Sequence, residues 1–340
     1  MNKKNKKVLI TGISGMVGSH LIEYLLKNTS WDFFGMIRVR SPLNNLKKII
    51  ENKKLLKRVS FLYGDLRDTI SINNVVKTAK PDIVFHLAAQ SFPKTSFDSP
   101  IETYDTNIQG TTRLLDALKN YAPEAIIHVC SSSEVYGRVP KEKIPIDEDC
   151  TFHPASPYAI SKAGTDLVGR FYFEAYKMNT LITRMFTHTG PRRGDVFAES
   201  TFAKQIAMIE KNYLPPVVKV GNLESLRTIA DVRDAVRAYH LLVSKNPQMG
   251  EAYNIGGSYS CTVKNILEYL ISLSSKNGIS YEIDFERVRP IDADLQVPNI
   301  NKFTSHTGWK PEVPFEKTML DLLNYWREEI DTNPYSYIQR

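Results

Sequence analysis

Tyr158 and Lys162 are the side chains whose types and spacing most plainly suggest proton transfer. Residues four positions apart lie on the same face of a helix. A tyrosine hydroxyl, with an ordinary pKa of about 10, is a weak base at neutral pH, but an adjacent ammonium group favours the phenolate. The pair can therefore take a proton from a substrate hydroxyl group. Because Y-x-x-x-K also arises by chance, the groups around it decide its meaning.

Two further polar side chains come from the run C-S-S-S-E at residues 130–134. Ser132 lies at the end of a strand-like run, 26 residues before Tyr158, and could bind the same substrate oxygen. Glu134 lies just past the strand end, where parallel sheets place their ligands. A carboxylate beside a sugar can act as a base and then as an acid on neighbouring carbons. We therefore predict an acid/base role for Glu134, the alternative being a surface glutamate in a loop.

A glycine-rich turn stands between the first strand-like run and the first helix-like run. Its glycines allow a tight turn, close approach of a pyrophosphate and packing of helix on strand, and the helix start offers free N–H groups to phosphates. The spacing is G-x-x-G-x-x-G, and glycine turns that bind no nucleotide are also common between a strand and a helix. The predicted cofactor contacts here are Gly12, Gly15, Met16, Val17 and Gly18.

The end of the second strand-like run discriminates between the two nicotinamide dinucleotides. An NAD site usually has an acidic residue there, which binds the ribose 2′-hydroxyl. This chain has Arg38 and Arg40 and no acid, and a guanidinium favours a 2′-phosphate. The sequence therefore predicts NADP rather than NAD, unless the two arginines are ordinary surface residues. Further cofactor contacts are expected where the next two strand-like runs end, at Asp65, Leu66, Leu87, Ala88 and Ala89.

Arginines in Pro/Gly-rich or loop-like stretches recur in the second half of the chain, at Arg192, Arg193, Arg227 and Arg289. Several arginines around one cleft would suit a diphosphate; the alternative is four unrelated surface residues. His86 and His188 each stand at the end of a strand-like run. Since no group of His, Cys, Asp and Glu has metal-ligand spacing, we predict no metal.

The elements that must position these groups alternate regularly in the first half of the chain. The strand-like runs are mostly apolar, as in strands covered on both faces, and their alternation with helix-like runs predicts an α/β fold with a doubly wound parallel sheet. The strand-like runs are 8–11, 33–37, 59–63, 83–87, 126–130 and 181–185. The helix-like runs between them are 17–28, 43–56, 70–79, 101–120 and 157–176.

The pattern loosens after about residue 186, where Pro, Gly and Arg accumulate. A last strand-like run at 252–255 is followed by a helix-like run at 263–274. We predict a nucleotide-binding domain over 1–186, with returning elements near 228–256. The remaining residues, 187–227 and 257–340, would form a smaller C-terminal substrate-binding lobe packed across the carboxyl edge of the sheet.

Composition excludes several classes of protein. Hydrophobic residues at 42% and charged residues at 24% are globular values and exclude a disordered chain. Four of the seven net positive charges come from the N-terminal lysines, Lys3, Lys4, Lys6 and Lys7, so we expect no nucleic-acid partner. No apolar stretch is long enough for a signal peptide or a membrane span. Three widely spaced cysteines argue against a disulfide framework and favour a cytoplasmic protein.

Taken together, these motifs resemble the extended short-chain dehydrogenase/reductases that act on nucleotide sugars, which have a Rossmann-like sheet, and among them the GDP-mannose 4,6-dehydratases. The resemblance covers the chain from Val8 to about Arg327. It rests on the order of T-G-x-x-G-x-x-G at 11–18, Y-G-D-L at 63–66, L-A-A-Q-S at 87–91, S-S-S-E-V-Y-G at 131–137, S-P-Y-x-x-x-K at 156–162, P-R-R-G at 191–194, V-G-N-L at 220–223, R-P at 289–290 and T-G-W-K-P at 307–311.

The resemblance implies a reaction. Tyr158, with Lys162, would remove the proton of the sugar C4 hydroxyl while hydride passes to NADP. Glu134 would take the C5 proton and assist loss of the C6 hydroxyl as water, and hydride would return to C6, giving a 4-keto-6-deoxy sugar. Ser132 stands in place of the family's hydroxyl residue. The resemblance adds Ser91, His188 and Arg193 to the cofactor contacts and implies substrate contacts at Ser132, Ser133, Thr187, Asn222, Arg227 and Arg289.

The chain departs from this family at two places near the expected sugar site. The dehydratases have Phe-Asn-His where this chain has Phe-Thr-His, which puts Thr187 in the place of an amide. They also have Glu-Ser before Pro-Arg-Arg, where this chain has Thr189 and Gly190. The sugar therefore need not be mannose, and we also consider GDP-N-acetylglucosamine and a GDP-heptose as candidate substrates.

Three other functions are compatible with the same fold. A GDP-4-keto-6-deoxy-mannose reductase is similar throughout and can also carry Glu134, but P-R-R-G at 191–194 favours the dehydratase. A C4 epimerase more often has Thr or Ala at the position of Glu134. A catalytically silent NADP-sensing regulator would be expected to have lost Tyr158 or Lys162. By resemblance we also expect a homodimer or homotetramer, formed through the helices at 101–120 and 157–176.

Overall fold

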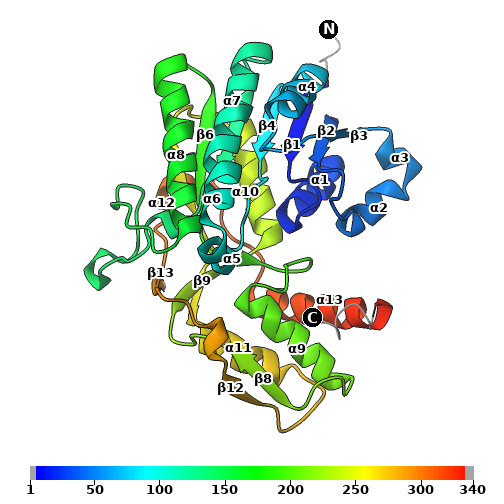
Figure 1. Ribbon diagram of the computed structural model, residues 1–340, viewed down its shortest axis with the longest axis vertical. Coiled ribbons are helices and arrows are strands. Elements are labelled where there is room, and N and C mark those ends of the chain that lie inside the picture. The colour runs from blue at the N-terminus through cyan, green and yellow to red at the C-terminus, as the bar shows by residue number, and fades with distance from the viewer. Residues whose placement is uncertain (1–4, 292, 334–340) are drawn as a thin grey trace.

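A computed structural model of the protein describes residues 5–291 and 293–333. Lys3, Lys4 and residues 334–340, which the sequence places in the N-terminal tail and the second lobe, lie outside this range. The larger part is a seven-stranded sheet in the order β10-β6-β5-β4-β1-β2-β3, with every pair parallel (Figure 1). Its strands are β1 (Lys7–Thr11), β2 (Asp32–Ile37), β3 (Val59–Tyr63), β4 (Ile83–His86), β5 (Ile126–Cys130), β6 (Thr180–Met185) and β10 (Ala252–Ile255). The predicted α/β doubly wound sheet is confirmed.

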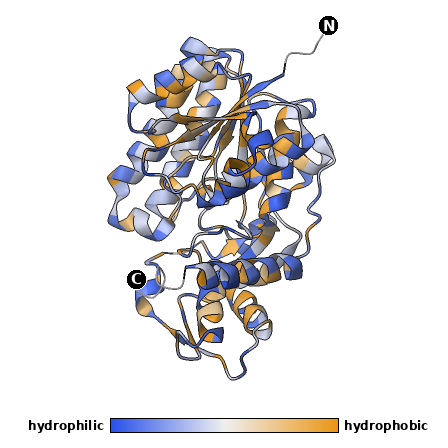
Figure 2. Ribbon diagram, turned by 90° about the vertical axis from the view of Figure 1, so that its right-hand side faces the viewer, coloured by the Kyte–Doolittle hydropathy of each residue, from blue (hydrophilic) through white to orange (hydrophobic). Residues whose placement is uncertain are grey.

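Helices cover both faces of this sheet. One face packs against α1 (Met16–Asn28) and α10 (Val232–Ser244). The other packs against α4 (Thr69–Ala79), α7 (Gly110–Tyr121) and α8 (Pro157–Tyr176). On β1, Ile10 belongs to the first core and Leu9 to the second, because successive side chains of a strand point to opposite faces. Both positions must therefore be apolar, and Figure 2 shows hydrophobic residues gathered in these strands.

Two predicted helices are interrupted. The one predicted over 43–56 consists of α2 (Lys47–Ile50) and α3 (Lys53–Leu56), because the Asn52 side chain accepts from Lys54 N and Leu55 N and so starts a new helix. The one predicted over 101–120 consists of α6 (Pro100–Tyr104), a π-helical turn at Asp105–Gln109, and α7. A short helix, α5 (Pro93–Asp98), precedes α6.

The smaller part lies beyond the carboxyl ends of the large sheet (Figure 1). Its central strand, β9, pairs with an antiparallel strand on one edge and with two short parallel strands on the other. These strands are β9 (Leu226–Asp231), β11 (Tyr259–Thr262), β7 (His188–Thr189) and β13 (Leu295–Gln296). A separate pair, β8 (Val217–Val220) and β12 (Ser280–Ile283), and the helices α9 (Ala198–Glu210), α11 (Val263–Ser272) and α13 (Phe315–Thr332) complete it.

The two parts exchange elements along the chain. α10 and β10, from the predicted returning segment, pack with the large sheet, whereas β9 belongs to the small sheet. α12 (Asn301–Thr307) lies against β10, and its Phe303 and the following Trp309 belong to the core around α1 and α10. The predicted boundary places residues 301–309 in the second lobe, so the packing differs from the prediction here. None of the helices within the described ranges is long and apolar enough to cross a membrane.

Candidate active site

Tyr158 and Lys162 lie in the first turns of α8, directly beside the end of β5. Ser156 starts this helix by accepting a hydrogen bond from Ala159 N at 3.0 Å. The ammonium group of Lys162, which is buried, donates to the backbone oxygen of Cys130 at 2.7 Å. The helix start thus holds both side chains against the carboxyl end of the central strand.

Ser132 and Glu134 complete the group from the other side. Ser132 Oγ accepts from Glu134 N at 3.2 Å and so opens a 3₁₀ turn at Ser133–Val135. The side chains of Ser132 and Tyr158 are hydrogen-bonded, and the charge of Glu134 acts on the Tyr158 hydroxyl. The structure therefore brings Ser132, Glu134, Tyr158 and Lys162 to one point at the end of β5. These residues define a candidate acid/base site.

Opposing contributions set the pKa of the Tyr158 hydroxyl. Burial raises the pKa of the Tyr158 hydroxyl above its ordinary value, while the hydrogen bond with Ser132 and the charge of Arg193 oppose this rise. Burial likewise lowers the pKa of Lys162. An adjacent ammonium favours the phenolate, but among the protein's own groups burial outweighs the contributions that lower the pKa, so these groups hold Tyr158 as a neutral phenol. The reason is that removing either group from water disfavours its charged form.

Arg193 is a cation of this site. Its Nε donates to Glu199 Oε1 at 3.2 Å, and its guanidinium lies 3.3 Å from the centre of the Phe197 ring. Its charge also acts on His188, whose pKa falls to about 3 mainly because of burial and further because of Arg193. Arg193 is therefore held between the start of α9 and Tyr158.

Arg192, which the sequence grouped with Arg193, points elsewhere. It adopts a left-handed backbone conformation with φ of 70°, and its Nη2 pairs with Glu23 Oε1 of α1 at 2.7 Å. The preceding Pro191 accepts at its backbone oxygen a hydrogen bond with His20 Nε2 at 3.1 Å. The prediction that Arg192 belongs to a cation cluster around the cleft is therefore wrong, because this turn directs it into an ion pair with α1.

The glycine-rich turn has the shape that a dinucleotide requires. Gly12 has φ of 71°, and a Cβ there would lie 2.8 Å from Ala88 N. A Cβ on Gly18 would lie 2.3 Å from the backbone oxygen of Gly12. Gly15 is the residue before α1 and has no side chain that could accept a hydrogen bond. The first backbone N–H groups of α1, from Met16 onward, are therefore not capped by a side chain. This cradle, which larger side chains would fill, fits the diphosphate of a dinucleotide cofactor.

The predicted adenosine end of the cofactor site brings Arg38 and Asp65 together. Arg38 follows β2 and is exposed. Burial raises the pKa of Asp65, but hydrogen bonds from Arg67 and the charges of Arg67 and Arg38 outweigh it, so that the pKa falls below its ordinary value. Leu66 is buried against Gly110, where a Cβ would approach within 2.7 Å. Arg40 is exposed beyond Arg38.

Asn107 is a positioning residue that the sequence reasoning missed. It lies in the π-helical turn before α7, buried, and its Oδ1 accepts from Gln90 N at 2.8 Å. Its Nδ2 donates to Ser161 Oγ at 2.8 Å, and that hydroxyl donates to the Tyr158 backbone oxygen at 2.7 Å. Asn107 thereby joins the loop after β4, which contains the predicted contacts Leu87, Ala88, Ala89 and Ser91, to the start of α8. The sequence could not indicate this role, because a single asparagine within a helix-like run belongs to no motif.

The predicted substrate contacts come from both parts of the molecule. Ser133 is buried in the 3₁₀ turn, and the backbone oxygen of Thr187 accepts from Ala230 N of β9 at 2.9 Å. Arg227 lies on β9 and donates to the backbone oxygen of Ala293. Asn222 Nδ2 donates to Ser225 Oγ at 3.1 Å. Arg289 lies between β12 and β13. The structure leaves their substrate roles as predictions.

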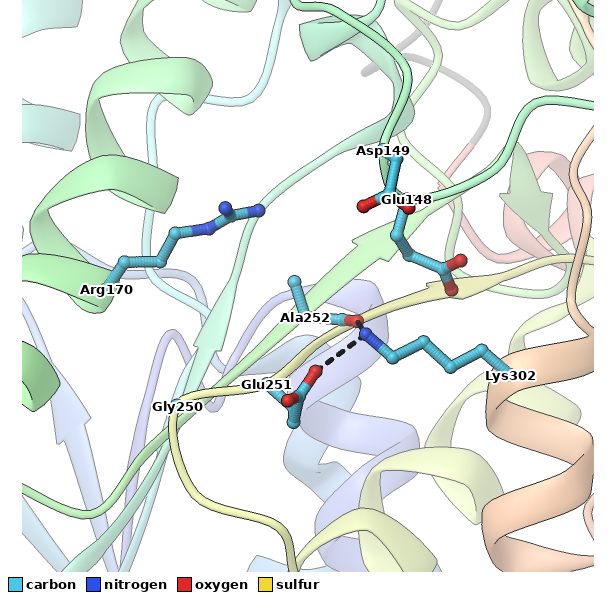
Figure 3. A pocket seen from close by; sticks show the side chains of 7 residues that line it. All are labelled: Glu148, Asp149, Arg170, Gly250, Glu251, Ala252 and Lys302. Atoms are coloured by element: carbon cyan, nitrogen blue, oxygen red, sulfur yellow. Dashed lines mark hydrogen bonds and ion pairs between the residues drawn. The ribbon is translucent and has the colours of Figure 1, made fainter.

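A charged cavity of about 240 Å³ lies apart from these residues, at the outer edge of β10 (Figure 3). Its lining contains none of the predicted site residues and consists of Glu148, Asp149, Arg170, Gly250, Glu251, Ala252 and Lys302. Across residues 5–291 and 293–333, no group of three or more His, Cys, Asp or Glu side chains could hold a metal ion.

The parallel sheet, the glycine cradle and the Ser132–Tyr158–Lys162 group define an extended short-chain dehydrogenase/reductase. The family model described as GDP-mannose 4,6 dehydratase matches residues 9–322. The chain belongs to this family. GDP-mannose 4,6 dehydratase 1 of Arabidopsis thaliana is 33% identical over 329 residues, covering 93% of this chain and 88% of that protein.

Reductases are also among the similar proteins. The GDP-6-deoxy-D-mannose reductase of Pseudomonas aeruginosa is 28% identical over 328 residues, covering 96% of this chain and 98% of that protein. The solved structure of RMD from Pseudomonas aeruginosa complexed with NADPH superposes with a TM-score of 0.81 at 27% identity. The superposition covers 96% of this chain and all of the other, which confirms the predicted fold over both parts.

Proposed function

We propose that the protein is a GDP-sugar 4,6-dehydratase that converts a GDP-hexose or GDP-heptose to its 4-keto-6-deoxy form. The membership of the family supports the class of reaction. The observation that carries the proposal is the match of residues 9–322 to the family model described as GDP-mannose 4,6 dehydratase. Glu134, whose charge acts on Tyr158, would supply the second acid/base group. A second acid/base group next to the phenol is what elimination of water requires beyond oxidation.

Each side chain of the site has a separate task in this reaction. Tyr158 takes the proton of the sugar C4 hydroxyl. Ser132, through its hydrogen bond with Tyr158, orients the tyrosine hydroxyl for this transfer. Glu134 takes the proton of C5 and gives it to the departing C6 hydroxyl, which leaves as water. Lys162, held at the Cys130 backbone oxygen, places a positive charge beneath Tyr158. The predicted contacts of the turn at 12–18 would hold a nicotinamide dinucleotide, which would supply a hydride acceptor and donor and a positive charge that favours the phenolate.

A GDP-4-keto-6-deoxy-sugar reductase is the second candidate, because a reductase is among the similar proteins. A reductase needs one proton donor for the C4 oxygen, a task that Tyr158 alone can perform. It has no step for a carboxylate beside C5. Because such a reductase can also carry Glu134, that residue does not discriminate; P-R-R-G at 191–194 and the family model described as GDP-mannose 4,6 dehydratase favour the dehydratase.

One incubation separates the two candidates. The purified protein is mixed with GDP-mannose, GDP-N-acetylglucosamine or a GDP-heptose and a catalytic amount of NADP, without reductant. A dehydratase converts one of these sugars to a product lighter by one water, with no net NADPH. Turnover only with a 4-keto sugar and stoichiometric NADPH would establish the reductase instead. The same experiment identifies the preferred sugar.

NADP is the cofactor that we propose, in preference to NAD. Arg38 stands at the end of β2, where an NAD site usually has a carboxylate, and its charge reaches Asp65. A solved relative is described as complexed with NADPH. The arginine would pair with the 2′-phosphate. The predicted contacts of the turn at 12–18, and those of His188 and Arg193, remain part of this proposal.

We also propose that two copies of the chain associate through the helical segment at 101–120, which contains α6 and most of α7, and through α8, as a homodimer or within a homotetramer. Large apolar side chains on these helices are exposed, among them Ile101 at 76%, Leu167 at 56% and Phe171 at 53%. Such a surface usually marks an interface. Light scattering of the protein and of the Leu167→Glu variant tests this, since the variant should shift towards the monomer.

The cytoplasm is the compartment that we propose for this enzyme. Cys130, Cys150 and Cys261 all lie within the described residues and form no disulfide. A reducing compartment suits three unpaired thiols. Fractionation of cells that produce the full chain tests this assignment.

A further inference from the structure

The backbone N–H of Tyr158 finds its hydrogen-bond partner outside its own helix. The N–H groups in the first turn of a helix have no carbonyl partner within that helix. In α8 the proline at the first position has no N–H, and Ala159 N donates to the cap residue Ser156. Among the first three positions this leaves the N–H of Tyr158, which donates to Ser96 Oγ of α5 at 3.0 Å.

The Ser96 hydroxyl is oriented to accept this bond. Its Oγ donates to the backbone oxygen of Pro93, one turn earlier in α5, at 2.6 Å. A hydroxyl has one proton and two acceptor positions, so the proton lies towards Pro93 and a lone pair is available to Tyr158. Ser96 is not exposed to solvent. Removing its hydroxyl would therefore take away the acceptor of the Tyr158 N–H and leave nothing of the same kind in its place.

The contact between α5 and α8 depends on few side chains. The two helices pack against each other, and the buried residues of α5 are Pro93 and Ser96. Phe92, the residue before α5, is 39% exposed, and Ser91, a predicted cofactor contact, precedes it. α5 therefore connects the cofactor loop to the start of α8, and its buried serine makes the bond to Tyr158.

The backbone oxygen of Tyr158 is held by the same stretch of chain. Ser161 Oγ donates to this oxygen at 2.7 Å, and Asn107 Nδ2 donates to Ser161 Oγ at 2.8 Å. Asn107 also accepts from Gln90 N at 2.8 Å and donates to the backbone oxygen of Gln90 at 2.9 Å. Residues 90–107 thus fix both backbone polar groups of Tyr158, the N–H through Ser96 and the oxygen through Asn107.

We propose that Ser96 is a positioning residue on which the turnover of Tyr158 depends, an inference that rests on the proposed function. Proton transfer requires the phenol oxygen to lie within hydrogen-bond distance of the sugar hydroxyl. The Tyr158 side chain leaves the backbone in the first turn of α8, where the helix supplies few hydrogen bonds of its own. Fixing this backbone from α5 therefore fixes where the phenol points.

The first measurement separates turnover from binding. Turnover of Ser96→Ala is measured with saturating GDP-sugar and NADP, and the dissociation constants of both ligands are measured separately. We expect the turnover number to fall about tenfold, because a small misplacement of a reacting group is costly, while both dissociation constants stay unchanged. If Ser96→Ala fails to fold, Ser96→Cys replaces it, since a thiol is close in size and a weaker acceptor.

Thr307 of α12 provides a matched control. Its Oγ1 donates to the Phe303 backbone oxygen at 2.8 Å and accepts from Trp309 N at 3.2 Å, which is the bonding pattern of Ser96. Thr307 is 2% exposed, and its two partners belong to the core around α1 and α10. Thr307→Val should lower the thermal midpoint, as Ser96→Ala does, but leave the turnover number unchanged.

Hydrogen exchange measures the bond itself without any turnover. The amide of Tyr158 should exchange faster in Ser96→Ala than in the wild type, because its acceptor is gone. Exchange at this amide should not change in Thr307→Val. An amide that exchanges equally fast in the wild type and in Ser96→Ala would show that the bond does not hold Tyr158, and would overturn the proposal.

The outcomes distinguish this proposal from the proposed function. Unchanged turnover in folded Ser96→Ala, or an equal loss in Thr307→Val, refutes the positioning role and leaves the dehydratase standing. A wild type that only reduces a 4-keto sugar with NADPH refutes the dehydratase. The same comparison, made on that reduction, then decides the role of Ser96, because Tyr158 is the proton donor there too. A wild type that converts no nucleotide sugar refutes both.

Discussion

The beginning and the middle of α8 place ionisable groups in equally buried surroundings but satisfy them differently. Tyr158, Lys162, Asp166 and Arg170 recur every four residues and so lie along one stripe of the helix. Lys162 is 6% exposed and Asp166 is not exposed at all. In the described residues, Lys162 has a backbone oxygen as partner and forms no ion pair. Asp166 pairs with two arginines, Arg170 and Arg184.

The middle of α8 is a closed network. Arg184 of β6 is fully buried and donates to both Asp166 oxygens, at 2.8 and 3.2 Å. Its remaining nitrogen donates to the Tyr136 hydroxyl at 2.8 Å, and that hydroxyl donates to Asn254 Oδ1 at 2.8 Å. The charged groups of Asp166 and Arg184 are thus hydrogen-bonded to each other and to neighbouring side chains, so we interpret this network as structural. At the start of α8, Lys162 has a backbone oxygen and no carboxylate as its partner within the described residues, and that is the difference between the two regions.

The cavity in Figure 3 shows why charge beside a cavity does not identify a site. Its Arg170 is paired with Asp166 at 2.9 Å, and Lys302 donates to Glu251 Oε2 at 2.6 Å. Glu148 accepts from Asn254 N at 2.7 Å and so satisfies the outer edge of β10. These charged residues of the lining are therefore paired with each other or with residues of the closed network. The acid/base pair lies elsewhere, at the end of β5.

The largest effect should come from removing the reactive groups at the start of α8. Tyr158→Phe and Glu134→Gln should each lower the turnover number by about a thousandfold, because each loses a proton-transfer group. The affinity for NADP should be kept. Tyr136→Phe, in the closed network, is the control and should cost stability rather than turnover. Full activity of Glu134→Gln would refute its acid/base role.

Breaking the closed network should mainly affect stability. Asp166→Asn leaves the buried Arg184 without its counter-charge, and we expect the free energy of unfolding to fall by about 3–5 kcal/mol. Lys162→Met should leave stability unchanged or raised, since it removes a buried ammonium, while activity is lost. Urea unfolding of both variants measures the difference. A stable Asp166→Asn protein would mean that the two regions of α8 do not differ as described.

Buried histidines should make the protein sensitive to acid. Burial, aided by nearby positive charges, lowers the pKa from 6.5 to about 4 for His20 and to about 3 for His86, His128 and His188. Because the unfolded chain binds these protons and the folded chain does not, stability is greatest above about pH 6.5 and falls as the pH drops towards 4. Each imidazole contributes up to about 1.4 kcal/mol per pH unit. Urea midpoints between pH 8 and 5 should show this slope; a flat profile would contradict it.

The smallest expected effect concerns the adenosine end of the cofactor site. Arg38→Ala should weaken NADP binding about tenfold, through loss of a charge-assisted contact, and leave NAD binding unchanged. Arg40→Ala is the control, since it is the next exposed arginine. Fluorescence titration with NADPH and NADH measures both. An equal loss for the two cofactors would remove Arg38 from the 2′-phosphate site.

Much of the sheet could be predicted because its signals are local. The mostly apolar runs at 59–63, 126–130 and 252–255 coincide with β3, β5 and β10, since a strand covered on both faces is rich in apolar residues. The helix at 43–56 could not be predicted as two pieces, because its periodicity does not show that the Asn52 side chain caps the second one. The π-helical turn around Asn107 could not be predicted either, because the apolar periodicity of 101–120 does not show where a helix changes its hydrogen-bonding pattern.

The sequence by itself determined the α/β sheet, the glycine turn and the shared face of Tyr158 and Lys162, because all three follow from spacing along a few turns or strands. Tertiary structure decided how the charges are paired. It paired Arg192 with Glu23, and it placed Arg193 beside Glu199 and Tyr158. The physical reason is that solvation and pairing depend on neighbours far along the chain, which local spacing does not specify.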